Sequence, residues 1–576
     1  MRNRGLREFW TTDSETDPFH HCNRGDCLKC AGVGRIPKPF IWGATNGNDY
    51  VEFDTGEQLA EFFRGRRTIV YAHNGGRFDY HYLREYINSD ENIMVISGRL
   101  AKFKIGECEF RDSLNIFQQT ALAQFGGKFD IDYEKMEPDR RIDPNIFNEI
   151  KLYLRQDCVL LWEKLQQYFT KYGCGLTQAG AAMRLWANMA KVEPPRQTPE
   201  QFRRYKPFYY GGRVEYFKQE VRTQAFNVVD INSAYPRAML EKHPFSTSAE
   251  VTDTLPDDKD IERTLIRLRC KSDGAFPYRK DTGELTFPND GELREYFVTG
   301  WEYLAALDFN ALRHIEIVEV HRFGLSIDFT EYVERFYKER QHAKAIGDKA
   351  ENIFCKLFLN SLYGKFGSNP GGIHSENPDD DNPMDGYQEY VIAQDESLSR
   401  WKAQGYEASK PWGERYLMSR PLPEVKHRYF NVATAASITG WVRAYLYRSM
   451  RACQDLIYCD TDSLVARDTS RLPLGDSLGK WKLELQCNRY AIAGKKLYAF
   501  EAEDATYRDG YGLHDRKPKT GPWKIASKGA RLTPHEIIRI ADGETIQYLP
   551  ESPTYSLMRP EPRFINRQIH AFPLAN

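Results

Sequence analysis

The sequence has almost no net charge, because 80 lysine and arginine residues balance 81 aspartate and glutamate residues and leave a formal charge of -1. This balance neither indicates nor excludes a nucleic-acid partner, so any basic groove must be local. No apolar run approaches the roughly 18 residues that a membrane-spanning helix needs, and the first residues lead to Asp13 without the hydrophobic segment of a secretion signal. We therefore expect no membrane partner and a cytoplasmic, reducing setting.

Few of the cysteines lie close to one another in the sequence. Most of the 11 cysteines are single and lie in apolar stretches, as at Cys158, Cys355 and Cys453, where a buried reduced thiol is expected. The exception is one cluster made of His20, His21, Cys22, Cys27 and Cys30. C-x2-C is a common half of a tetrahedral zinc site, although the whole spacing matches no standard pattern. The alternatives are a structural Zn²⁺ that pins an insertion and a polar surface loop with reduced thiols.

The length of 576 residues is too great for one hydrophobic core. At about 150 residues per domain it predicts three to four domains. Within them, residues 458–463 carry two aspartates in the sequence YCDTDS, flanked by apolar residues on both sides. This pattern predicts two strands joined by a tight turn. Asp460 and Asp462 on such a turn can bind hard cations such as Mg²⁺, as phosphoryl transfer requires, but Asp-x-Asp is also common as a solvated turn.

Further acids lie on three predicted elements of the N-terminal part. A strand over residues 8–12 runs into Asp13 and Glu15, which share one side because alternate strand residues face the same way. A second strand, at 68–72, leads through a glycine-rich turn to Asp79 at the start of a predicted helix. The helical segment 149–161 places Tyr153 and Asp157 on one face. Each acid alone is more often a surface residue or a helix cap.

The middle of the chain supplies partners for the hairpin acids. A buried strand beginning at residue 226 places Asp230 near its end, before the chain breaks at Pro236. Segments 330–344 and 349–362 predict an antiparallel helical hairpin. On the second helix Lys356, Asn360 and Tyr363 form a polar stripe. Solvent exposure is one interpretation of this stripe, and contact with phosphate and a base pair is the other.

In this order the segments resemble six motifs of proofreading family B DNA polymerases. The N-terminal acids resemble the three exonuclease motifs, and the later segments resemble motif A (DINSAYP from 230), motif B (KLFLNSLYG from 356) and motif C (YCDTDS from 458). One departure is that four residues separate Asn74 from Asp79, one more than in many relatives. The resemblance implies a multi-domain α/β (α+β) protein. A ribonuclease-H-like 3'–5' exonuclease domain would precede a right-hand polymerase of palm, fingers and thumb.

The resemblance also assigns roles to residues. Two Mg²⁺ or Mn²⁺ ions in the exonuclease half would be held by Asp13, Glu15, Asp79 and Asp157, with Tyr153 orienting the attacking water. The polymerase pair would be held by Asp230 and Asp462, with Asp460 in support. The ring of Tyr235 would reject a ribose 2'-OH. Residues implied to contact the nucleotide are Ile231, Ser233, Tyr235, Lys344, Lys356, Asn360 and Tyr363.

Smaller motifs resemble those of protein-primed polymerases, most of all the enzymes of tectivirus-type bacteriophages. They are YYGG from 209, TGWVR from 439, in which Val442 departs from the pattern, KLY from 496, and the segments YAHNGGRFD from 71 and IPKPFIWG from 36. Contacts with DNA or a terminal protein are implied for Asn74, Phe78, Ser113, Leu114, Lys135, Tyr209, Gly211, Gly212, Arg443, Lys496 and Tyr498. A viral enzyme of this kind would work in the cytoplasm of a bacterial host.

The resemblance implies an order of domains. They are an exonuclease at 1–190 with a Cys/His insertion at 20–30, palm at 191–244 and 427–505, terminal-protein regions at 245–326 and 367–426, fingers at 327–366 and thumb at 506–576. The second region begins as a loop rich in proline, glycine and aspartate and continues with short β segments at 387–392 and 415–418. We expect it to lie against palm and thumb as a clamp around the product duplex. A tolerated surface loop is the alternative.

The expected function is replication of a linear genome by a DNA-directed DNA polymerase with proofreading and strand displacement. Its partners would be template and primer DNA, deoxynucleoside triphosphates and a terminal protein whose hydroxyl group serves as the first primer. A conventionally primed family B polymerase would share the catalytic acids without needing the two inserted regions. A non-catalytic single-strand-binding protein would need aromatic and basic residues but no clustered carboxylates.

Overall fold

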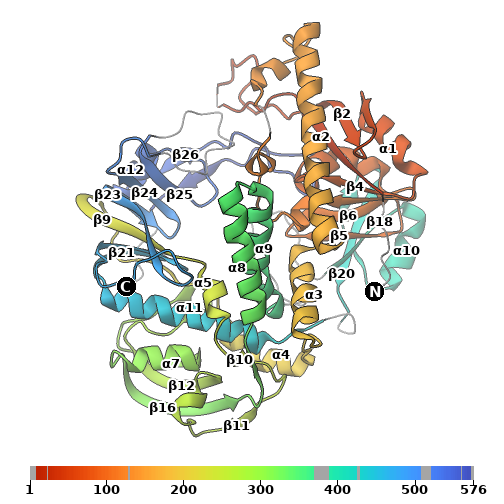
Figure 1. The fold of residues 1–576 in the computed structure, drawn as a ribbon. Helices are drawn as coiled ribbons and strands as arrows, with labels where there is room; N and C mark the ends of the chain where they lie inside the picture. Colours follow the sequence, from red (N-terminus) through yellow and green to blue (C-terminus); the bar gives the residue numbers. More distant parts are fainter. Residues whose placement is uncertain are drawn as a thin grey trace.

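The computed structural model describes residues 8–22, 24–127, 130–368, 388–423, 428–507, 521–559 and 561–571. Two large sheets stand on either side of a helical hairpin, and a small sheet lies below (Figure 1). Within the described ranges, no helix has both the length and the apolar character needed to cross a membrane.

The N-terminal sheet carries the first group of acids. Its strands are β1 (Phe9–Thr16), β2 (Pro39–Thr45), β3 (Tyr50–Phe53), β4 (Ile69–Ala72), β5 (Asn92–Ile96), β6 (Arg99–Ile105) and β7 (Cys108–Asp112). They lie in the order β3-β2-β1-β4-β7-β6-β5, with β4 parallel to β1 and β7. The predicted strands are confirmed, but β1 extends through the acids, so Asp13 and Glu15 lie within the strand.

Helices cover this sheet. They are α1 (Gly56–Arg64) and α2 (Pro144–Tyr172), with short 3-10 turns η1 (Gly75–Arg77), η2 (Asp79–Tyr86), η3 (Ser113–Asn115), η4 (Leu122–Phe125) and η5 (Tyr133–Met136) between strands. The side chain of Asp143 caps α2 by accepting from the N–H of Asn145, and Pro144 occupies the first turn, where no donor is needed. Helix α2 packs on β1 and β2, which brings Asp157 to the acids of β1.

The second inserted region does not lie where we expected. Its described part forms β18 (Gln388–Ala393), α10 (Asp395–Ala403), β19 (Glu407–Trp412) and β20 (Arg415–Pro421). Strand β18 pairs antiparallel with β5, so three strands extend the exonuclease sheet to ten, instead of lying against palm and thumb. Without β18, β5 would be an edge strand with unpaired backbone N–H and C=O groups. The predicted loop at 369–383 and residues 384–387 and 424–427 lie outside the described residues.

Strands β18 to β20 also contribute side chains to the exonuclease core. Tyr390 and Ile392 face that core together with Trp412 and Leu417. The alternate residues of β18, Val391 and Ala393, pack under α10 with Tyr406 and Met418. Burial on both faces explains how the described strands of this region are held in place although they are too few to support a core of their own.

The palm is a seven-stranded antiparallel sheet. Its strands are β8 (Val214–Tyr216), β9 (Val221–Ile231), β21 (Gln454–Asp460), β22 (Ser463–Asp468), β23 (Trp481–Gly494), β24 (Leu497–Ala502) and β25 (Trp523–Ser527), in the order β25-β24-β23-β9-β22-β21-β8. Helices α5 (Ala234–Ala238) and α11 (Val432–Ala452) lie on it. The predicted hairpin around residues 458–463 is confirmed. Strand β25 lies beyond the predicted boundary at 506, yet it pairs with β24 and continues this sheet.

The helical hairpin is formed by α8 (Thr330–Ile346) and α9 (Lys349–Phe366), as predicted, with Gly347 in the left-handed region between them. It stands between the two large sheets (Figure 1). Helices α3 (Gln178–Ala190) and α4 (Pro199–Tyr205) and the turn η6 (Lys206–Phe208) lead from α2 to β8. Helix α3 packs on α9, whereas α4 and η6 pack on α11. Phe354 and Phe358 of α9 pack with α2 in one shared core, which fixes the hairpin against both halves.

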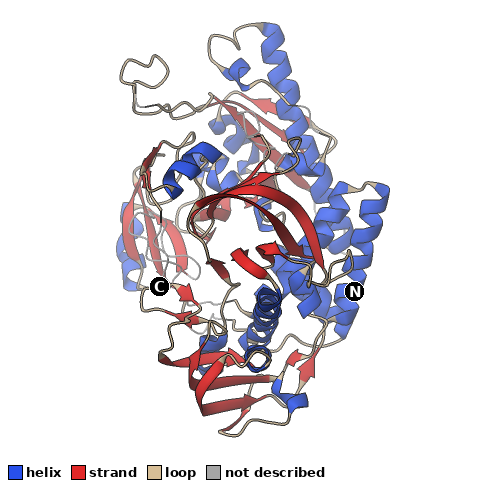
Figure 2. Ribbon diagram, turned by 90° about the vertical axis from the view of Figure 1, so that its left-hand side faces the viewer, coloured by secondary structure: helices blue, strands red, loops and turns tan. Residues whose placement is uncertain are grey.

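A small α/β unit occupies most of the first inserted region. It contains β11 (Glu250–Thr252), α6 (Asp258–Ile261), β12 (Thr264–Ser272), β13 (Tyr278–Arg279), β14 (Leu285–Thr286), β15 (Leu293–Thr299), α7 (Gly300–Leu307) and β16 (Leu312–Arg322). Strands β10 (His243–Pro244) and β17 (Ser326–Ile327) pair at its base. The sheet order is β11-β16-β12-β15, with its own core, seen at the bottom of Figure 2.

The C-terminal part consists of α12 (Pro534–Ala541), β26 (Ile546–Tyr548) and β27 (Arg567–Ile569). Helix α12 and the two paired strands share a core with β23 and β24. Between β26 and β27 the chain leaves this core and reaches the exonuclease domain, where Leu557 is buried.

Candidate active sites

The hairpin acids and the motif A acid meet at one end of the palm sheet. Asp460 ends β21, Asp462 begins the return to β22, and Thr461 between them has φ +58, in the left-handed region. Strand β9 pairs with β22 so that Asp230 lies opposite Ser463. The N–H of Ile231 donates to the carbonyl of Asp462 at 2.8 Å. This bond holds the two strands together and occupies the Ile231 N–H, which the sequence had assigned to the nucleotide.

The electrostatics of these acids are unusual. Burial, followed by the charges of Asp462 and Glu484, raises the pKa of Asp230 from 3.8 to about 8. Burial and the charge of Asp460 raise the pKa of Asp462 to about 6. Lys496 compensates in part, since its Nζ lies 3.1 Å from Asp460 Oδ2. Oxygen ligands that repel one another in this way are suited to a hard divalent cation, because the ion would favour their ionised forms.

Cations of the helical hairpin lie beside the acids. The side chain of Lys356 is close enough to lower the pKa of Asp230, although burial and the neighbouring acids outweigh it. Burial and the charges of Arg340, Lys482 and Lys356 lower the pKa of Lys344. The sequence predicted Lys344 and Lys356 but missed Arg340, whose Nη1 lies 3.4 Å from the hydroxyl of Ser233. This cationic cluster suits a polyphosphate.

Tyr235 of α5 and Tyr363 of α9 form a stacked pair, with ring centroids 4.1 Å apart and planes 8° apart. The charge of Asp462 acts on Tyr235, so the pair lies next to the acids. Asn360 lies on the same polar stripe of α9 and is exposed. The structure therefore brings both predicted aromatic residues to the polymerase acids.

A second cluster of carboxylates is formed by β1 and α2. Ligand oxygens of Asp13, Glu15 and Asp157 all lie within 4.8 Å of one another. The Oη of Tyr153, one helical turn before Asp157, lies 3.2 Å from the Oη of Tyr133. Burial and the charge of Asp157 raise the pKa of Tyr153, so its hydroxyl stays protonated. Three carboxylates beside a phenol are a suitable donor set for Mg²⁺ or Mn²⁺.

Asp79 does not join this cluster. It is buried, and its Oδ1 accepts a hydrogen bond from the hydroxyl of Ser14 at 2.5 Å. Ser14 faces the side of β1 opposite to Asp13 and Glu15, because neighbours on a strand alternate. Burial raises the pKa of Asp79 to about 6. The sequence placed Asp79 with the other acids, and in this structure it is held by Ser14 instead.

Two predicted DNA contacts are internal. The hydroxyl of Ser113 is buried and lies 2.9 Å from His73 Nδ1. Arg443 is buried in α11, where its Nε donates to Glu302 at 2.7 Å and its Nη1 donates to the carbonyls of Tyr210 and Gly211. Its buried position shows that Arg443 fixes the YYGG segment to the small α/β unit. Both side chains are buried in this structure, and their contact with DNA or a terminal protein stays a prediction.

Other predicted contacts have these places. Asn74 is exposed in the left-handed region, and Leu114 is partly buried. Lys135 binds Glu149 at 2.7 Å. Tyr209 packs against Gly367. A side chain added at Gly212 would place its Cβ 2.4 Å from Thr461. A Cβ added at Gly211 would have no described atom within 4 Å. Phe78 contacts the ring of Tyr555, and Tyr498 stacks on Phe500. Their roles toward DNA or a terminal protein stay predictions.

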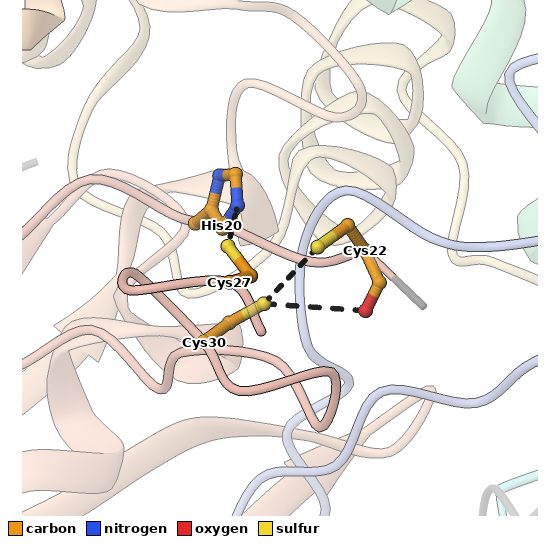
Figure 3. Close-up of side chains that lie close together, drawn as sticks. All are labelled: His20, Cys22, Cys27 and Cys30. Carbon is orange, nitrogen blue, oxygen red and sulfur yellow. Dashed lines mark hydrogen bonds between the residues drawn. The ribbon is translucent and has the colours of Figure 1, made fainter. Parts of the chain in front are cut away.

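The cysteine–histidine cluster assembles from four of its five candidate residues. Ligand atoms of His20, Cys22, Cys27 and Cys30 all lie within 4.8 Å of one another (Figure 3). His21 faces away from them, and its Nδ1 lies 2.9 Å from the carbonyl oxygen of Pro550.

Sequence reasoning missed four residues that act on these sites: Ser14, Arg340, Glu302 and Glu484. Glu484 lies on β23, which pairs with β9 and places Lys482 opposite Asp230. The alternating sequence WKLEL at the start of β23 indicates a strand, but no local signal indicates that β23 pairs with β9.

Comparisons with known proteins agree with this architecture. The family described as "DNA polymerase type B, organellar and viral" matches residues 136–380. The chain is 32% identical to the DNA-directed DNA polymerase of Enterobacteria phage PRD1 over 97% of both chains. It is 23% identical to the DNA polymerase of Bacillus phage phi29 over 58% of this chain and 55% of that one.

Among solved structures, phi29 DNA polymerase complexed with primer-template DNA and incoming nucleotide substrates matches with a TM-score of 0.70 and 16% identity. The match covers 98% of this chain and 100% of that one. This likeness shows that the two chains share their overall fold.

Proposed function

The chain belongs to the protein-primed family B DNA polymerases, and from this premise we propose that it copies DNA at the palm acids and degrades it from the 3' end at the acids of β1 and α2. The observation that carries the proposal is the meeting of Asp230, Asp460 and Asp462 at one end of the palm sheet, where burial and mutual repulsion raise the pKa of Asp230 to about 8.

Divalent cations, Mg²⁺ or Mn²⁺, held by Asp230 and Asp462 would lower the pKa of the attacking hydroxyl and neutralise charge on the leaving pyrophosphate. The chain positions the reactants around these acids. Arg340, Lys344 and Lys356 provide positive charge for the triphosphate, and the stacked rings of Tyr235 and Tyr363 form a floor for sugar and base. Catalysis is then positioning and charge neutralisation, without a covalent intermediate.

Proofreading is the proposed role of the second cluster. Asp13, Glu15 and Asp157 offer ligand oxygens close together, as two-metal hydrolysis of a phosphodiester requires. The phenol of Tyr153 stays protonated and can orient a water molecule. The two clusters lie on different sheets, so each activity depends on its own acids.

The first primer is proposed to be a hydroxyl of a terminal protein. Support comes from the two inserted regions, of which one forms a separate small sheet and the other extends the exonuclease sheet. To test this, the enzyme is incubated with a terminal protein, labelled deoxynucleotide and linear template DNA. The label should appear on the terminal protein before it appears on DNA. Label that appears only on an added oligonucleotide primer would favour the conventionally primed alternative.

Strand displacement is proposed for the same enzyme. The described part of the second inserted region pairs with β5 and packs in the exonuclease core, so it is held rigidly against that domain. Synthesis through a downstream duplex, measured with each enzyme limited to one binding event, should proceed as far as on a single-stranded template. Arrest at the duplex would remove this part of the proposal.

A further inference from the structure

The loop between β1 and β2 brings three thiols and one imidazole together without closing a disulfide. His20 Nε2 lies 3.2 Å from Cys27 Sγ, and Cys22 Sγ lies 3.5 Å from Cys30 Sγ (Figure 3). Ligands bound at 2.0–2.3 Å from a tetrahedral centre lie about 3.5–3.8 Å apart. The four atoms therefore already have nearly the spacing of a closed Cys3His site.

Backbone N–H groups lie near two of the sulfur atoms in the cluster. The N–H groups of Gly32 and Gly34 are in hydrogen-bonding position to the sulfur of Cys30, and the N–H of Arg24 is in position to the sulfur of Cys22. The side chains of Lys29 and Arg35 both bind Glu137 and lie near His20. The guanidinium of Arg24 lies near the thiols of Cys22 and Cys27 and adds positive charge there. Such outer contacts orient metal ligands and stabilise their charge.

No described residue of this loop belongs to one of the hydrophobic core clusters. Leu28 and Val33 of this loop are exposed, and Ile36 near its end is only partly buried. Apart from the cluster, the described part of the loop is held by the ring contact of Phe19 with Phe78 and by polar contacts such as those of Arg35 with Glu137 and with the carbonyl of Pro18. A small segment without a hydrophobic core usually needs a disulfide or a metal ion to fold stably, and all cysteines are free.

The outer side of the same loop carries the C-terminal strap, which we define as the described residues 549–559 and 561–566. His21 contacts it through the carbonyl of Pro550, and the rings of His21 and Phe564 lie 4.4 Å apart. Gly34 has φ +91, and a Cβ on it would lie 2.3 Å from the ring of Phe564. The strap passes beside the cluster as the pale blue ribbon in Figure 3.

The strap also binds the exonuclease domain beyond the loop. Tyr555 Oη lies 2.6 Å from Tyr82 Oη. Arg84 donates to the carbonyls of Ser556 and Arg559, and Leu557 is buried in the exonuclease core. Both ends of the strap continue into β26 and β27, which belong to the core at the thumb end of the palm sheet. The chain thus forms a closed path from exonuclease through palm and thumb back to exonuclease.

We propose that His20, Cys22, Cys27 and Cys30 bind one Zn²⁺ as a closed structural site, and that this ion shapes the surface on which the strap docks. The two adjacent histidines have different roles, because His20 binds the ion and His21 binds the strap. Loss of the ion loosens the loop and with it the contact between thumb and exonuclease domain. The consequence for DNA synthesis, namely shorter products per binding event, rests on the proposed polymerase function.

The ion is tested by metal analysis of the purified full-length chain after gel filtration. We expect about one zinc per chain under the closed-site rule. His20→Ala and Cys27→Ser should lose the zinc, whereas His21→Ala and Cys174→Ser should retain it. Replacement of the ion by Co²⁺ should give the intense visible absorption of a tetrahedral thiolate site. A parent chain without zinc, a Cys22–Cys30 disulfide in the non-reduced protein, or equal loss in His20→Ala and His21→Ala would overturn the site.

The docking of the strap is tested by amide hydrogen exchange without DNA or nucleotide. Gly34→Ala, which leaves all four ligands in place, should retain zinc but raise exchange in residues 549–559. Zinc removal and Cys27→Ser should raise it as well. Unchanged exchange in the strap after zinc loss would overturn the coupling. These readouts do not depend on polymerase activity, so an inactive enzyme would count against the proposed function and leave the zinc results intact.

Processivity is the last readout. Gly34→Ala should shorten the products made in one binding event on a long primed template, while addition of the first nucleotide stays at the parent rate. Products of parent length would contradict the claim that docking of the strap is needed for long products.

Discussion

Asp230→Asn should stabilise the metal-free protein while it abolishes nucleotide addition. The pKa of this carboxyl is raised from 3.8 to about 8 by burial and by Asp462 and Glu484. At pH 7 the folded protein therefore holds a proton that the unfolded chain has released, which destabilises the fold by roughly 4 kcal/mol. Because the carboxyl is only partly buried, solvent screening reduces the effect to about 2 kcal/mol.

The sign of the pH dependence follows from the same shift. Below about pH 4 the carboxyl is protonated in both states and costs the fold nothing; as pH rises toward 8, the cost grows, because only the unfolded chain gains by ionising. Asparagine cannot ionise and avoids this cost. The advantage of the variant should therefore increase from pH 5 to pH 8.

Thermal denaturation in chelator at several pH values is the assay. For a domain of 150–250 residues, about 2 kcal/mol corresponds to a rise in melting temperature of about 4–8 °C. Added Mg²⁺ should reduce the difference, since the ion stabilises the parent through the ionised acids. Asp476→Asn, at a side chain that is 93% exposed, serves as the control and should show no such trend. A variant that melts no higher than the parent, or a difference independent of pH, would refute the reasoning.

Three other perturbations have expected outcomes. Arg443→Ala removes one partner of the buried pair with Glu302 and should destabilise the protein by about 3–5 kcal/mol in denaturant unfolding; a loss below about 1 kcal/mol would contradict its structural role. Tyr235→Val removes a stacked ring and should raise incorporation of ribonucleotides in a single-nucleotide assay, and unchanged sugar discrimination would show that another residue is the gate. Gly212→Ala places a Cβ against Thr461 and should lower the rate of addition while leaving 3'–5' degradation intact; equal loss of both would count against a local effect.

Features fixed by local sequence could be predicted. The hairpin around Asp460 and Asp462 depends on adjacent strands and a tight turn, and the polar stripe of Lys356 and Tyr363 depends only on helical spacing. The chain order of six motifs then indicated the family.

Features that depend on tertiary packing could not be predicted. No local signal shows that β18 pairs with β5, because edge strands look alike in sequence. The sequence grouped Asp79 with the other acids and gave no sign of its hydrogen bond with Ser14. The helical position of Arg443 does not reveal that Glu302, from a distant insertion, buries it. Similarly, His20 and His21 are adjacent and face different ways, so only the fold shows which of them joins the cysteines.

The most direct test of the account compares two variants on one labelled primer-template. Asp462→Asn should lose nucleotide addition but still shorten the primer from its 3' end, whereas the double variant Asp13→Ala, Glu15→Ala should extend the primer but no longer shorten it. This opposite pattern is what two separate carboxylate sites predict. Loss of both activities in either variant would contradict the central claim that the palm acids add nucleotides and the acids of β1 and α2 remove them.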